Sequence, residues 1–224
     1  WLDDSAAARN VCYLYHDSAT DTITFGTSGT LSAATSRGNT IARYPTDDNG
    51  IAILTSTLTN NLNISALDVT SSLVSPTSLT NTNISVIPGG ATSALRHYAI
   101  PMSKNAWVVA TYFTTNTQVQ YGYYTYDPDT QEIVTNTPIV GPKLTTTNST
   151  PVSILRHSDT SFVALQFSSS LTATLYNVTD TTIVSASNPT TLMTTISING
   201  VTLAKLTDTD YLAVYSYSPT ASFI

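Results

Sequence analysis

Residues 155–165 read Leu155-Arg156-His157-Ser158-Asp159-Thr160-Ser161-Phe162-Val163-Ala164-Leu165, and the fold expected for the whole chain follows from this stretch. A short apolar run closes at the basic residue Arg156, a polar turn follows, and a second apolar run begins at Phe162. Val and Phe favour strands, whereas Asp and Ser favour turns. The stretch therefore predicts two short strands joined by a tight turn.

The same order of features recurs along the chain. A basic residue closes a short apolar run at four places, which we call the basic positions: Arg43, Arg96, Arg156 and Lys205. They lie 49–60 residues apart and use half of the eight Lys and Arg residues of the chain. Each is followed by a turn and an apolar run, and later by an aromatic or apolar residue before a polar turn. This pattern predicts units of about 50 residues with four strands each.

No window of the sequence shows sustained helical periodicity, so an all-β fold is expected. We expect a single β-repeat domain over residues 1–224, with units at approximately 1–38 (partial), 39–89, 90–149, 150–197 and 198–224 (partial). The two partial units could complete each other and close a ring. The phase of the repeat at the two ends favours instead a slice of a longer repeat protein.

Four strands in a unit of this length resemble the blades of β-propellers. The resemblance is one of pattern and covers nearly all of the chain, but neither the Gly-His…Trp-Asp signature nor the full calcium loops of particular propeller classes occur. It implies a β-propeller-like array of four-stranded repeats, with the first strand of each unit nearest the axis. The alternative is a β-sandwich or jelly roll, which has the same strand content but does not require the period.

Charge is scarce in this chain, and hydroxyl side chains take its place. Charged residues make up 10% of the sequence, whereas 69 of the 224 residues are Ser or Thr. The net charge of −6 disfavours nucleic acid as a partner, and no apolar run is long enough to span a membrane. The composition is typical of secreted proteins, so we expect an extracellular location or one on a cell or virion surface. Four sequons offer N-glycosylation sites: Asn63, Asn83, Asn148 and Asn177.

The basic positions allow two interpretations. In the functional one, they form a ring of positive charge near the axis that binds an anion or a carboxylated sugar. In the structural one, each basic side chain pairs with an acid in the following turn, such as Asp47, Asp159 or Asp208, and ties neighbouring units together. We favour the structural interpretation, because a residue present in every unit usually serves the unit.

Two histidines follow basic positions, and they would occupy equivalent places in neighbouring units. His97 and His157 alone cannot make a metal site, which needs three or four ligands, and the other units hold Tyr44 and Leu206 there. The stretch 47–50 resembles a calcium loop only faintly, because its equivalents lose the oxygen ligands. The sequence predicts no metal site and no cofactor.

The most aromatic stretch of the chain carries four tyrosines: Tyr121, Tyr123, Tyr124 and Tyr126. Strand alternation places Tyr121 and Tyr123 on one face and the other two on the opposite face. An exposed row of this kind could stack on sugar rings, which makes it the candidate glycan-binding site. In the alternative interpretation, the rings pack between units.

No residue pattern typical of catalysis stands out, and no catalytic residue is predicted. Glu132 is the only Glu, whereas most glycosidases need two poised carboxyl groups, and no nucleophile-elbow or phosphate-loop motif occurs. We therefore expect a non-catalytic extracellular module that forms part of a surface structure, appendage or filament through self-association or contact with other surface proteins. A glycan-binding, lectin-like propeller is the second hypothesis, and a glycoside-processing enzyme is the third.

Overall fold

The structure, a computed structural model, describes these segments of the chain: 9–11, 14–25, 29–32, 36–43, 51–58, 61–68, 77–84, 94–113, 118–140, 144–145, 153–167, 170–179, 182–194 and 198–217. Every regular element within them is a β-strand. The predicted all-β class is therefore confirmed. None of these segments forms a helix long and apolar enough to cross a membrane.

Three antiparallel sheets, each built from consecutive strands, form the body of the molecule. Sheet I has the order β5 (Ser36–Arg43), β6 (Ile51–Leu58), β7 (Asn61–Asp68) and β8 (Thr77–Ile84). Sheet II has the order β9 (Ala94–Ser103), β10 (Ala106–Phe113), β11 (Gln118–Asp127) and β12 (Glu132–Val140), and β13 (Leu144–Thr145) also pairs with β11. Sheet III has the order β14 (Ser153–Ser158), β15 (Ser161–Phe167), β16 (Ser170–Val178) and β17 (Ile183–Ser185), and β18 (Thr190–Thr194) also pairs with β16.

Three smaller strand pairs accompany these sheets. Sheet IV consists of β19 (Ile198–Lys205) and β20 (Tyr211–Tyr217). The N-terminal hairpin consists of β2 (Leu14–Asp17) and β3 (Thr22–Phe25), while β1 (Arg9–Val11) pairs with β4 (Gly29–Ser32). Each of these three groups contains two strands within the described part of the chain.

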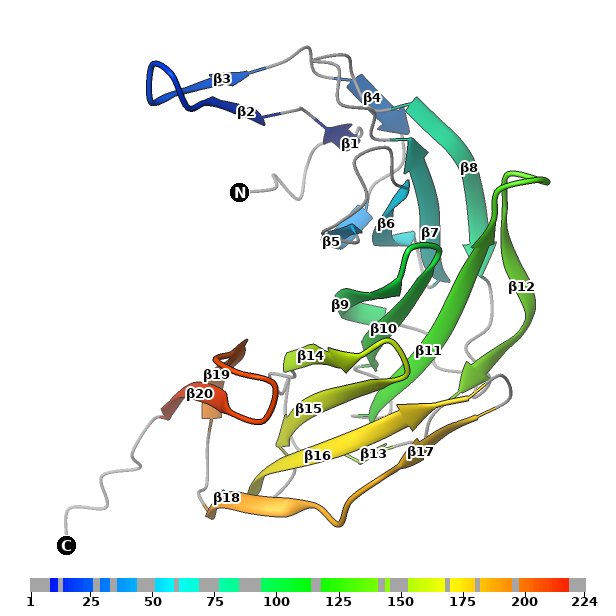
Figure 1. Ribbon diagram of the computed structural model, residues 1–224. Helices are drawn as coiled ribbons and strands as arrows, with labels where there is room; N and C mark the ends of the chain where they lie inside the picture. The colour runs from blue at the N-terminus through cyan, green and yellow to red at the C-terminus, as the bar shows by residue number, and fades with distance from the viewer. Residues whose placement is uncertain are drawn as a thin grey trace, which may run out of the picture.

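The sheets follow one another in the order of the sequence. The first strand of each sheet lies beside the first strand of the next, so that β5 contacts β9, β9 contacts β14, and β14 contacts β19. Figure 1 shows the result as an open arc, with the N-terminal hairpin at one end and sheet IV at the other. The described strands form several separate antiparallel sheets and do not close into a propeller ring.

Apolar side chains fill the space between each pair of neighbouring sheets. Sheets I and II share a core that includes Ile64, Trp107 and Tyr124. Sheets II and III share a second core around Tyr121 and Phe162, and sheets III and IV share a third. Because side chains alternate along a strand, β10 and β11 supply residues to two of these cores at once. The unbroken apolar run at positions 107–110 suits a strand covered on both faces.

The position of the Tyr124 side chain, two residues further along β11, requires a glycine at position 122. A Cβ atom at this position would lie 2.5 Å from Oη of Tyr124 and 2.7 Å from its Cε2. Real side-chain atoms do not approach so closely in a packed interior. The absence of a side chain at Gly122 therefore leaves room for the Tyr124 ring within the core of sheets I and II.

Candidate functional site

The described basic positions lie between sheets, where they make polar contacts. Arg156 stands near the end of β14 and its side chain is partly buried. Its Nε donates a hydrogen bond of 2.9 Å to the backbone carbonyl of Met102 in β9, and its Nη2 donates to Oδ1 of Asp159. One guanidinium thus joins sheet III to sheet II and also holds the turn that follows its own strand.

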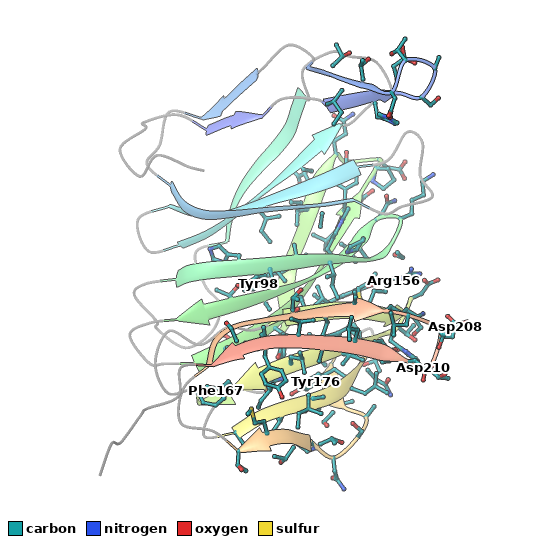
Figure 2. The ribbon with its side chains drawn as sticks, turned by 90° about the vertical axis from the view of Figure 1, so that its left-hand side faces the viewer. Tyr98, Arg156, Phe167, Tyr176, Asp208 and Asp210 are labelled. Atoms are coloured by element: carbon teal, nitrogen blue, oxygen red, sulfur yellow. The ribbon has the colours of Figure 1, made fainter. Side chains whose placement is uncertain are left out.

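Lys205 repeats this arrangement one sheet further on. Its Nζ lies 2.9 Å from Oδ1 of Asp208 and donates to the backbone carbonyl of His157 at 3.2 Å. Met102 and His157 are each the penultimate residue of the first strand in their sheet, so the acceptor is equivalent in both contacts. Figure 2 shows Arg156 and Asp208 at the same end of the sheets. The predicted ion pairs of Arg156 with Asp159 and of Lys205 with Asp208 are present.

Arg96 does not occupy the same place, and this corrects the expected alignment. Arg156 lies opposite Phe162 and Lys205 lies opposite Tyr211, each next to the turn. Arg96 lies opposite Tyr112, near the start of β9, and the residue opposite Trp107 is Pro101. Arg96 is therefore not equivalent in register to Arg156 and Lys205. Arg43 ends β5, and the side chains of Arg43 and Arg96 lie outside the described residues, as does the stretch 47–50.

The two histidines are likewise not equivalent. His97 is buried in the middle of β9 opposite Thr111, and burial lowers its pKa from 6.5 to about 4. His157 is partly exposed near the turn after β14, where its Nδ1 shares a hydrogen bond with Oη of Tyr211 in sheet IV. Within the described segments, no group of three His, Cys, Asp or Glu side chains is placed to hold a metal ion.

The tyrosine row lies between sheets, with the alternation that the sequence predicts. Tyr121 and Tyr123 face the core shared with sheet III, while Tyr124 and Tyr126 face the core shared with sheet I. Three of these rings are buried, and Tyr123 is partly buried. The row therefore does not present an exposed platform for stacking on sugars, because neighbouring sheets cover both of its faces.

A buried polar contact completes the packing between sheets II and III. Tyr121 packs edge-on against Phe162, with ring centroids 5.2 Å apart, and lies 5.1 Å from the ring of Tyr176. Nε2 of Gln166 donates to Oη of Tyr121 at 2.5 Å and to Oη of Tyr176 at 3.0 Å. Burial raises the pKa of Tyr121 well above its ordinary value, which keeps the phenol neutral.

Several acidic side chains stabilise turns. Oδ1 of Asp17 accepts a hydrogen bond of 2.9 Å from the backbone nitrogen of Ala19, and Oδ1 of Asp127 accepts one of the same length from Asp129. These bonds lower the pKa of both carboxyl groups. The hydrogen bond from Lys205 does the same for the pKa of Asp208. Each lowered pKa is therefore explained by hydrogen bonds within a turn or by the ion pair with Lys205.

The sequons fall on strands wherever they are described. Asn63 in β7 lies directly opposite Asn83 in β8. Asn177 lies in β16 and is exposed, whereas Asn148 falls outside the described residues. N-glycosylation requires an asparagine at the surface, and the exposed Asn177 meets this requirement.

Sequence reasoning missed the partners that join sheet III to sheets II and IV. Gln166, Tyr211 and Ser153 all carry such contacts, and Oγ of Ser153 accepts a hydrogen bond of 3.1 Å from the backbone nitrogen of Leu203. The one signal available was the aromatic residue that opens the second strand of a sheet, as Tyr211 opens β20. Compared with protein-family models and with curated proteins, the chain has no match in either set.

Proposed function

We propose that this chain is a non-catalytic structural module of an extracellular or surface-exposed assembly, built as a propeller-like array of sheets. Sheet-by-sheet stacking supports this proposal, because successive sheets meet through apolar cores and through the contacts of Arg156 and Lys205. The low content of charged residues and the high content of Ser and Thr support the extracellular location.

The observation that carries the proposal is the uncovered face of sheet IV. Its inner face, which includes Val201, Leu203 and Ala213, packs against sheet III. On its other face Leu212 is 48% exposed and Val214 is 52% exposed. A sheet normally buries an apolar face against another layer. Two neighbouring apolar side chains left in solvent therefore favour an assembly partner at this face.

The experiment is sedimentation velocity of the purified chain over a wide range of concentration, followed by negative-stain microscopy of the largest species. Association that grows with concentration is expected, and replacement of Leu212 by Ser should weaken it. A single monomeric species at every concentration would contradict the proposed function. The glycan-binding alternative has no support from the tyrosine row, because that row is covered by neighbouring sheets.

A further inference from the structure

Within the described residues, the two ends of the arc hold complementary parts of a sheet. Sheets II and III each begin with two long strands and continue with a hairpin that adds the outer strand. Sheet IV has the first two strands, and β20 pairs only with β19 among the described residues. The N-terminal hairpin has the outer two strands, and β2 pairs only with β3 in the same described part of the chain.

The N-terminal hairpin matches the outer hairpin of sheet II in detail. The pair Asp17 and Thr22 closes its four-residue loop, as Asp127 and Glu132 close the loop between β11 and β12. The first aspartate accepts a hydrogen bond from the backbone nitrogen two residues on in both loops. The last loop residue has a positive φ in both, 50° at Asp21 and 58° at Gln131. The two loops therefore agree in length, in their aspartate hydrogen bond and in the left-handed backbone of the last loop residue.

The burial of one isoleucine shows what the N-terminal hairpin lacks. Ile133 follows the loop of sheet II and is 4% exposed in the core shared with sheet I. In sheet III, Ile183 opens β17 opposite Val178 and is also 4% exposed, in the core shared with sheet II. Ile23 holds the matching place in the N-terminal hairpin and is 64% exposed. Its side chain therefore has the character of a core residue without the sheet that would cover it.

Sheet IV also exposes an apolar side chain whose counterpart in sheet II is buried. Trp107 and Tyr211 are the aromatic residues nearest the start of β10 and β20, so Val214 corresponds to Ala110. Ala110 is buried in the core that sheet II shares with the next sheet, whereas Val214 faces away from sheet III and is exposed. Among the described residues, sheet IV therefore has neither outer strands nor a following sheet.

We propose that a second copy of this chain completes sheet IV, with the N-terminal hairpin of that copy pairing along the edge of β20 that has no partner among the described residues. This inference rests on the proposed function and names the surfaces through which the chain assembles. Within one chain, three full sheets separate the hairpin from sheet IV, and the two lie at opposite ends of the arc (Figure 1). A second copy can bring them together without changing either copy, as head-to-tail contacts do.

The pairing follows from the match with sheet II. Tyr124 stands three residues before the loop aspartate of β11 and lies opposite Trp107. Leu14 stands three residues before Asp17, so β2 would pair antiparallel to β20 with Leu14 opposite Tyr211. In this arrangement Ile23 would face sheet III of the first copy, and sheet I of the second copy would cover Val214.

Two variants test the contact, one on each partner surface. Ile23→Asp alters the hairpin and leaves sheet IV intact, whereas Val214→Asp alters sheet IV and leaves the hairpin intact. Both residues are exposed in the single chain, so both variants should fold, as circular dichroism and thermal unfolding will check. Each should associate about tenfold to a hundredfold more weakly than the wild type, because a charge replaces an apolar side chain that becomes buried. Val184→Asp is the matched control, since Val184 is 46% exposed on sheet III and should leave association unchanged.

The decisive measurement mixes the two variants and follows them by native mass spectrometry, with one variant isotopically labelled. The hairpin of Val214→Asp and the sheet IV of Ile23→Asp are both intact, so the mixture should form a complex of one copy of each. Variants that associate alone as strongly as the wild type would overturn the hairpin contact while leaving the proposed function standing. A wild type that is monomeric, with both variants less stable and no complex in the mixture, would show closure within one chain and overturn the inference.

Discussion

Lowering the pH should destabilise this protein through His97, a histidine that the fold buries without charge. The residue lies on β9, a strand that contacts the first strands of sheets I and III, and burial of its side chain lowers its pKa to about 4. In the unfolded chain the same group has its ordinary pKa of 6.5. Above that value the imidazole is neutral in both states, so the full stability is present. As the pH falls from about 6.5 to about 4, the unfolded chain binds the proton first and stability is lost.

The size of the effect follows from the difference between these pKa values. Each unit of pKa difference corresponds to about 1.4 kcal/mol. The difference at His97 therefore lowers the free energy of unfolding by about 3 kcal/mol between neutral pH and about pH 4. Domains of ordinary stability unfold with about 5–15 kcal/mol, so one buried imidazole should remove a substantial part of the total.

Urea unfolding at a series of pH values measures this effect, with His97→Gln as the control because its amide does not titrate. The two proteins differ only at position 97, so the difference between the two curves isolates that position. The lowered pKa values of Asp17 and Asp127 affect stability only at more acidic pH, as each carboxylate takes up its proton. The wild type should lose about 3 kcal/mol more than the variant. Parallel curves would refute the assignment of a buried, neutral His97.

Three further substitutions test the contacts that Arg156 and Gln166 make. Arg156→Met removes the hydrogen bond to the Met102 carbonyl and should cost about 1–2 kcal/mol in the free energy of unfolding. Asp159→Asn removes only the partly exposed ion pair and should cost less than about 1 kcal/mol; equal losses in chemical denaturation would argue against the role of the carbonyl contact. Gln166→Leu leaves the buried hydroxyl of Tyr121 without its donor and should cost about 1–3 kcal/mol, whereas an unchanged thermal midpoint would show that another group satisfies the phenol.

Local patterns in the sequence predicted the strands and several of their side-chain contacts. Alternation in the tyrosine row placed Tyr121 and Tyr124 on opposite faces, because a strand cannot do otherwise. The acid three residues after Arg156 or Lys205 could be recognised as its ion-pair partner, because the basic and the acidic residue flank one tight turn. These features depend on a few neighbouring residues, and neighbouring residues are what a sequence presents directly.

The misplacement of Arg96 shows where that approach fails. A basic residue after an apolar run marks the end of β14 and β19, but β9 is ten residues long and carries its basic residue near its start. Alignment of the units by their basic residues therefore placed Arg96 opposite Trp107, where the structure has Pro101, five residues further along β9. The aromatic residues at the start of the second strands would have been the better guide, because they are held by the core.

The contacts between sheets could not be predicted, because their acceptors carry no sequence signal. Arg156 donates to a backbone carbonyl 54 residues away, and any residue could supply that oxygen. The same limit applies to the tyrosine row as a glycan site. Its composition fits a binding platform or a core equally well, and only the position of the neighbouring sheets distinguishes the two.

The described residues form three separate cores, and this division has a consequence for how the molecule unfolds. Each core joins one sheet to the next, so the energetic coupling runs in one dimension from neighbour to neighbour. Damage in one core should weaken the two adjoining sheets far more than distant ones. Sheets II and III, each supported on both faces, should be the last to lose their amide protection, while sheet IV should fray first. In an assembled chain of copies, that fraying end would become an interior position, and joining would itself be the means of stabilisation.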